Sequence, residues 1–132
     1  MVNEDKLLNL IIKYNYDKEL NNLKDILDYL HNNYLYLFTT IKISKHKLLQ
    51  IPKDDLLIIL NNLFLLNNQP YFPVFSNQKN TNKQFKYCVL VSIFDCLKLM
   101  KKLNITNEII INPNQKDNFK LTKDIIQYFK SK

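Results

Sequence analysis

The sequence predicts an α/β (α+β) fold, in which a mixed β-sheet of about five strands carries packed helices and follows two N-terminal helices. Three observations predict it. Apolar residues recur at helical spacing through residues 4–32. Near Tyr34 the pattern changes to stretches rich in tyrosine, phenylalanine, threonine and isoleucine, which are typical of strands. Residues 87–103 then read as a strand followed directly by a helix. A chain of 132 residues is expected to form a single domain, 1–132, with a helical pair (1–33) and an α/β portion (34–132).

The helical pair is predicted from two amphipathic patterns. Residues 4–15 form the first helix, and its inward face carries Leu7, Leu10, Ile11 and Tyr14. Residues 18–32 form the second helix, and its inward face carries Leu20, Leu23, Leu27 and Leu30. Asp17 is expected to cap the start of the second helix. The connection is short, so the two helices are expected to pack antiparallel.

The first part of the sheet is predicted after Tyr34. Residues 34–43 suit a strand, and residues 44–55 a polar, basic loop. Residues 56–66 are apolar and predict a strand with a break or bulge at Asn61-Asn62. A short helix that begins at Pro52 is the alternative interpretation.

A hairpin and a further short helix are predicted next. Asn67-Asn68 suits the hairpin turn, because asparagine tolerates positive φ where glycine is lacking. The returning strand covers residues 70–75. Ser76 is then positioned to cap a short helix through residues 77–84.

The strand-then-helix unit has clear boundaries. Residues 86–91 are predicted as a buried strand, and Ser92 with Asp95 has the spacing of a capping box. The helix is expected to end near Leu103, with Lys101 and Lys102 at its negative C-terminal end.

The last strand and helix are separated by turn chemistry. Residues 108–111 predict a strand, which Asn112-Pro113 ends, because proline disfavours the helical region for the residue before it. Asn112 is therefore expected to be extended, and Asn114 to take positive φ. Thr122 is expected to cap the final helix.

Three short motifs, taken in order, resemble the N-terminal domain of the SseB family, bacterial proteins named for enhanced serine sensitivity. They are Tyr-Phe-Pro-Val-Phe-Ser at 71–76, Ser-Ile-Phe-Asp-Cys-Leu at 92–97 and Ile-Asn-Pro at 111–113. The resemblance covers about residues 20–130 and is clearest from Gln69 to Phe129. It implies a single SseB N-terminal-like domain with a mixed-sheet α/β fold in the bacterial cytosol, and no established catalytic activity.

The chain departs from the family in three respects. The family usually has glycine in the hairpin and after Asn-Pro, where this chain has Asn68 and Asn114. The helix at residues 4–15 is an addition or a divergent start. The second domain of longer family members is not present in this sequence.

The composition and charge bear on possible partners. The chain contains no glycine, alanine, arginine or tryptophan, which indicates an A/T-rich genome. Its net charge is +7, and residues 36–132 contribute +9 (15 lysines against 6 acids) while residues 1–35 contribute −2 (4 against 6). A basic chain can bind an acidic partner. Without arginine, which reads guanine edges and clamps phosphates, sequence-specific nucleic-acid binding is disfavoured.

No catalytic or cofactor chemistry is predicted. Cys88 and Cys96 match no zinc or redox spacing and are expected to be reduced core residues. Asp54 and Asp55 are adjacent and suit a solvated loop end, and Asp95 suits a helix cap. Without glycine, a P-loop or dinucleotide fingerprint cannot be written in its usual form. We therefore expect neither an enzyme, nor a metal site, nor a cofactor.

Six residues are candidates for binding. Ser76 and the turn Asn112-Pro113-Asn114 are expected at the C-terminal ends of strands, where α/β sheets often hold ligands. A structural role for them is the alternative. The basic segments 42–47 and 79–86, the latter with Lys79 and Lys83, are candidates for a surface that meets an acidic protein.

These observations lead to one leading hypothesis and two alternatives. The leading hypothesis is a non-enzymatic bacterial binding module that acts through protein–protein contacts, with an immunity or secretion-associated role as its narrower form. The alternatives are a non-specific nucleic-acid binder that uses its lysines, and a small-molecule sensor at the strand-end edge. No signal peptide and no apolar run long enough for a membrane span are seen, so a cytoplasmic protein without membrane contact is expected.

Overall fold

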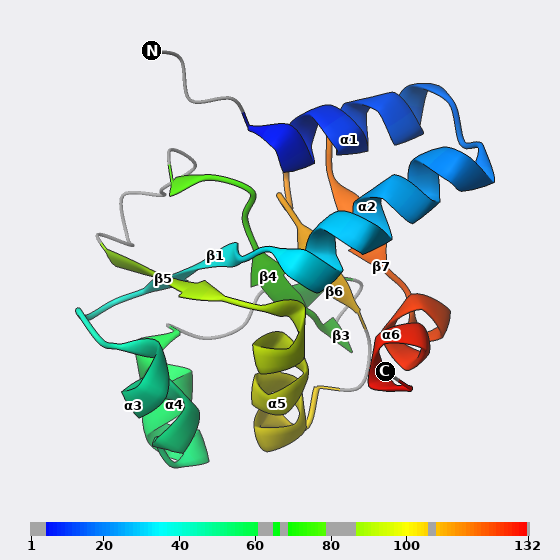
Figure 1. Ribbon diagram of the computed structural model, residues 1–132. Coiled ribbons are helices and arrows are strands. Elements are labelled where there is room, and N and C mark those ends of the chain that lie inside the picture. Colours follow the sequence, from blue (N-terminus) through cyan, green and yellow to red (C-terminus); the bar gives the residue numbers. More distant parts are fainter. Residues whose placement is uncertain (1–4, 61–64, 67–68, 79–86, 106–107, 132) are drawn as a thin grey trace.

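The computed structural model describes residues 5–60, 65–66, 69–78, 87–105 and 108–131. It begins with α1 (Lys6–Tyr16) and α2 (Leu20–Asn32), which pack together as an antiparallel pair (Figure 1). Asp5 caps α1 by accepting a hydrogen bond from the Leu8 N–H. The expected cap of the second helix is wrong: Asp17 ends α1, and Glu19 precedes α2 without a side-chain bond. Instead, the Asp17 carbonyl accepts a bond from the buried Asn22 amide.

A mixed sheet of five strands forms the centre of the fold, as predicted. β1 (Leu35–Thr39) pairs antiparallel with β5 (Tyr87–Val91), and β6 (Ile109–Ile111) pairs parallel with β4 (Phe72–Val74) and antiparallel with β7 (Phe119–Leu121). Two backbone hydrogen bonds between Tyr36 and Phe75, each of 2.9 Å, join β1 to the end of β4. The strand order is therefore β5-β1-β4-β6-β7.

Helices cover both faces of this sheet. Figure 1 shows the α1–α2 pair on one side, and α3 (Lys45–Gln50), α4 (Lys53–Ile59) and α5 (Ile93–Leu103) on the other. The last helix, α6 (Lys123–Lys130), packs beside α5. All three residues of β6 are buried, as expected for a strand with helices on both sides. β5 differs from the prediction of a buried strand, because Tyr87 and Leu90 are exposed.

Two helices replace the predicted basic loop and the first part of the predicted strand 56–66. The end of that strand, Leu65–Leu66, is a strand as predicted, and the predicted break at Asn61-Asn62 lies outside the described residues. Ser44 caps α3 by accepting a 3.2 Å hydrogen bond from the Lys47 N–H, and Leu48 is buried in the core. α4 follows Pro52, so the alternative interpretation of this segment was correct. Asp54 and Asp55 lie in the first turn of α4, where negative charge is favourable. An apolar run alone does not distinguish a buried strand from a short buried helix.

The predictions for the remaining elements were partly confirmed. β2 (Leu65–Leu66) and β3 (Gln69–Pro70) pair antiparallel, as the predicted hairpin requires, although its turn at 67–68 lies outside the described residues. β7 was not predicted at all: its three residues carry too little pattern to be recognised as a strand. Thr122 precedes α6 as expected, but its side chain makes no capping bond.

The helix α5 is fixed at both ends by polar contacts. The predicted capping box is confirmed: Asp95 accepts from the Ser92 N–H at 2.9 Å, and Ser92 Oγ accepts from the Asp95 N–H at 3.0 Å. Lys45 of α3 lies 3.4 Å from the Asp95 carboxylate. At the other end, the Lys102 ammonium donates to the carbonyls of Leu49 and Ile51 at 2.6 and 2.7 Å. These bonds satisfy carbonyls that the short helix α3 leaves unpaired.

Removal of the Lys102 ammonium should therefore cost stability. We expect Lys102→Met, which keeps most of the apolar stem, to lower the free energy of unfolding by about 1–2 kcal/mol, because it removes two charge-assisted hydrogen bonds. Lys101→Met is the matched control: it removes a neighbouring charge from the same last turn of α5, at an exposed position. Urea denaturation of the two variants measures the difference. Equal shifts of both midpoints would contradict this role for Lys102.

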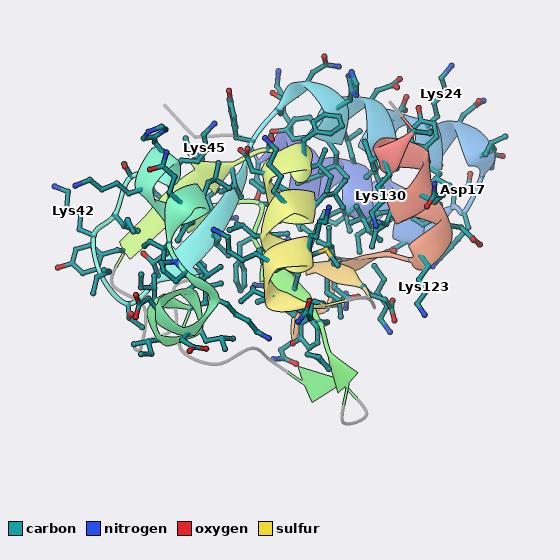
Figure 2. All side chains as sticks on the ribbon, turned by 90° about the horizontal axis from the view of Figure 1, so that it is seen from below. Asp17, Lys24, Lys42, Lys45, Lys123 and Lys130 are labelled. Atoms are coloured by element: carbon teal, nitrogen blue, oxygen red, sulfur yellow. The ribbon has the colours of Figure 1, made fainter. Side chains whose placement is uncertain are left out.

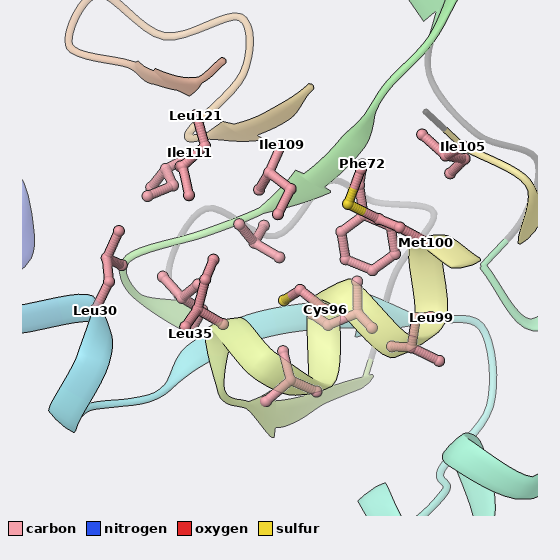
Figure 3. Packing of buried hydrophobic residues seen from close by; sticks show 14 of the residues in the cluster. Leu30, Leu35, Phe72, Cys96, Leu99, Met100, Ile105, Ile109, Ile111 and Leu121 are labelled. Carbon is pink, nitrogen blue, oxygen red and sulfur yellow. The ribbon is translucent and has the colours of Figure 1, made fainter. Parts of the chain in front are cut away.

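The core lies between the sheet and the helices. Its largest fully buried side chains include Phe72 of β4 and Phe129 of α6. Figure 3 shows the Phe72 ring beside Met100 of α5, with Ile109 of β6 next to it. Cys96 of α5 points into the same cluster. The apolar faces of the sheet and of α5 therefore meet in one continuous cluster.

Candidate functional site

The predicted binding residues at the strand ends bond mainly to one another. Asn112 Oδ1 accepts from the Ser76 N–H at 3.0 Å, and Asn112 Nδ2 donates to Ser76 Oγ at 3.0 Å. Ser76 Oγ in turn donates to Asp5 Oδ2 at 2.7 Å, and the Asn77 amide donates to the same oxygen at 2.6 Å. We call the four residues Asp5, Ser76, Asn77 and Asn112 the polar latch. It joins the ends of β4 and β6 to the start of α1.

The turn after β6 explains why Asn112 is so placed. The prediction of an extended Asn112 is wrong: its φ is 57°, although it precedes a proline. Its side chain is fully buried and held by Ser76, and its N–H donates to the Val74 carbonyl at 2.9 Å. These tertiary bonds outweigh the local preference of a residue before proline.

The rest of the turn has the conformation expected from its own residues. Pro113 is buried, and Asn114 is exposed with a φ of 63°, as predicted. The Gln115 N–H donates to the Asn112 carbonyl at 3.3 Å, so the four residues form a β-turn. A proline at the second position and a positive φ at the third position are features of a type II turn. Here Asn114 takes the third position, which glycine usually occupies.

This geometry favours a structural role for the strand-end residues. The bonding groups of Ser76 and Asn112 face each other and Asp5, and neither residue lines the two hollows described below. Asp5 was not predicted as part of this cluster; its position just before a helical pattern is a recognisable capping signal. Lys79 and Lys83, the other two candidates, lie outside the described residues, as does the whole basic segment 79–86.

The described residues include no metal-binding cluster, and both cysteine thiols have a raised pKa. Within the described ranges, no three histidine, cysteine, aspartate or glutamate side chains gather as a metal site would require. Burial, and secondarily the charge of Asp95, raises the pKa of the Cys96 thiol far above its usual value, and burial also raises the pKa of Cys88. A raised pKa keeps a thiol protonated and weakly nucleophilic at neutral pH.

The described residues form a groove between α5 and α6. Its volume is about 740 Å³, and it is partly open to solvent. The floor is apolar: Met100, Ile105 and Ile126 are almost fully buried. Four lysines stand on the rim, namely Lys98 and Lys101 of α5 and Lys123 and Lys130 of α6. We call this feature the α5–α6 groove; Figure 2 labels both of its α6 lysines.

The rim lysines are exposed. Among the described residues, no carboxylate lines the groove and none forms an ion pair with any of the four lysines. Asp124 lies in the first turn of α6 but does not line the groove. The groove therefore combines an apolar floor with four uncompensated positive charges, which suits an anionic, partly apolar partner.

The sequence analysis did not predict a binding role for these four lysines. Lys98 and Lys101 are three residues apart on α5, and Lys123 and Lys130 are seven apart on α6, so each pair lies on one helical face. This spacing could have indicated, within each helix, that the two lysines share one face. In the predicted basic segment 42–47, Lys45 already has partners within the chain. It forms an ion pair with Asp95 and lies 5.6 Å from the ring centre of Tyr34.

A second hollow of about 490 Å³ lies between the end of α1, β7 and the start of α6. Three lysines line it: Lys18, Lys116 and Lys120. Lys18 lies 5.1 Å from the ring centre of Tyr14, a cation–π contact. This hollow has a more polar lining than the α5–α6 groove, since Asn15, Asn118 and Thr122 also contribute to it.

The chain matches no known protein family, no curated protein and no solved structure. Among the described residues, no helix has both the length and the apolar character needed to cross a membrane.

Proposed function

We propose that this protein is a non-enzymatic, SseB-like binding module of the bacterial cytosol, and that it acts by contact with an acidic protein. The observation that carries the proposal is the α5–α6 groove, with its apolar floor and four uncompensated lysines. An immunity or secretion-associated role is the narrower form. The motifs at 71–76, 92–97 and 111–113 support the family part of the proposal.

The physical case rests on how the two parts of the groove act together. Exposed ion pairs contribute only about 0.2–1 kcal/mol each, so the rim lysines alone would not hold a partner. They raise the association rate and exclude cationic partners, while an apolar floor supplies the burial that affinity requires. A partner with carboxylates around an apolar patch satisfies both requirements.

The proposal is tested by reversing the charge of the groove. We expect Lys98→Glu combined with Lys123→Glu, here called the groove variant, to reduce partner capture from a host lysate by at least roughly tenfold at about 150 mM salt. Neither position lies in the last turn of its helix, so the dipole of each helix is not opposed at its C-terminus. Quantitative pull-down measures the captured proteins.

Lys24→Glu combined with Lys53→Glu is the matched control. It changes the net charge equally at two exposed positions that lie outside the groove and outside the basic segments 42–47 and 79–86. Figure 2 labels Lys24. Proteins retained by wild type and by this control, but lost from the groove variant, would support the proposal. If all three chains retained the same proteins, or wild type enriched none, the proposal would be wrong.

The second candidate function is non-specific nucleic-acid binding. The second hollow favours it, because three lysines surround Tyr14 and Phe119, and aromatic rings beside positive charge suit unpaired nucleotides. Such binding should weaken steeply as salt rises. A gel shift at about 150 mM salt separates the candidates: tight retention of nucleic acid there would favour this function over protein binding.

A further inference from the structure

The α5–α6 groove has walls made of helices, and this restricts what can occupy it. The backbone groups inside α5 and α6 are bonded within each helix, so the walls present side chains rather than free N–H and C=O groups. An extended peptide needs free backbone groups of its host to pair with, as at the edge of a sheet. A helix satisfies its own backbone and needs only complementary side chains.

The dimensions agree with a short helix as the occupant. The eleven residues of α5 and the eight of α6 correspond to lengths of about 16 and 12 Å at 1.5 Å per residue. Walls of these lengths match about two to three turns of a partner helix at about 5.4 Å per turn. Such a helix presents apolar side chains at i, i+3 or i+4, and i+7, which is the pattern of helices that dock in grooves.

The lysines of the groove determine which side chains would be favourable on the flanks of the partner helix. Lysines stand on both walls: Lys98 and Lys101 on one, Lys123 and Lys130 on the other. A helix lying between them meets positive charge on both sides of its apolar stripe. Carboxylates on both flanks would therefore be favourable, whereas lysine or arginine there would be repelled.

We infer that the α5–α6 groove binds an acidic amphipathic helix of the partner protein, with apolar residues on the floor and glutamate or aspartate against the two lysine pairs. This inference rests on the proposed function and specifies its partner. Asn104 and Gln127, which also line the groove, add hydrogen-bonding groups at the rim.

The test uses synthetic peptides and the whole chain. The probe is a labelled peptide of about three to four helical turns, with leucine at i, i+4 and i+7 and glutamate on both flanks. A scrambled peptide of the same composition keeps the charge but loses the apolar stripe. We expect the probe to bind wild type at least about tenfold more tightly than the scrambled peptide does, and to gain helicity on binding. The groove variant should weaken probe binding at least about tenfold, and the Lys24→Glu/Lys53→Glu control should not.

Each other outcome overturns the inference in a distinguishable way. Equal binding of both peptides, still dependent on Lys98 and Lys123, would show that the groove takes acidic chains without requiring a helix, and would leave the proposed function standing. Absence of probe binding would reject the helical occupant. The proposed function is tested separately, by lysate capture with the same variants. Groove-dependent binding to phosphatidylserine vesicles, with no binding of the probe, would replace the protein partner by an anionic membrane surface.

Discussion

Replacing Asn112 with alanine is expected to lower the free energy of unfolding by about 2–4 kcal/mol. The change removes both hydrogen bonds to Ser76 and breaks the polar latch at its centre. It also forces alanine to hold a φ of 57°, which asparagine tolerates better. The lost side-chain bond alone would cost about 1–2 kcal/mol, and the left-handed backbone adds to that. Urea denaturation of the purified chain measures the change.

Two further variants separate the side-chain and backbone contributions. Asn112→Gly removes the same bonds but accepts positive φ, so it should recover about 1 kcal/mol relative to alanine. Asn114→Ala tests the backbone contribution at an exposed position with a φ of 63°. An unchanged midpoint for Asn112→Ala, together with lost partner binding, would show that Asn112 is functional rather than structural.

Phe72→Ala should have the largest effect of any single change considered, a loss of about 3–5 kcal/mol. Phe72 is fully buried in β4, and its ring lies against Met100 of α5 (Figure 3). Its N–H also donates to the Glu108 carbonyl beside β6. Loss of the ring leaves a cavity where the sheet and α5 meet. Thermal melting with calorimetry would detect a much lower midpoint or an unfolded chain.

Tyr16→Ala serves as the control for Phe72, because Tyr16 is 93% exposed at the end of α1. Its expected effect is within about 0.5 kcal/mol. Similar midpoints for the two variants would contradict the placement of β4 in the core and with it the order of the sheet.

The two structural predictions and the binding predictions concern different parts of the molecule. Phe72 and Asn112 lie in the interior, whereas Lys98 and Lys123 are exposed on helices. Exposed substitutions away from caps and the core usually change stability little. Charge reversal in the α5–α6 groove should therefore change partner binding while leaving the melting midpoint nearly unchanged, which allows the two kinds of role to be measured independently.

The sequence alone was sufficient to predict the elements that are determined by residues close together in the chain. The amphipathic periods predicted α1 and α2, although Leu20, which was expected to face inward, is exposed. The spacing of Ser92 and Asp95 predicted the capping box that begins α5. Asparagine in place of glycine at Asn114 predicted a positive φ, because the turn after Pro113 requires it. In each case residues within one or two turns of each other determine the structure.

Tertiary structure alone decided the features that depend on distant contacts. The apolar run that contains α4 suited either a strand or a helix, and the three residues of β7 carried too little pattern, so local sequence did not decide either element. Asn112 took a left-handed backbone against the preference before proline, since Ser76, thirty-six residues earlier in the chain, bonds its side chain. The α5–α6 groove likewise exists only because two helices from separate parts of the chain pack side by side. The sequence determined that these helices carry lysines; only their packing brought the four charges around one apolar floor.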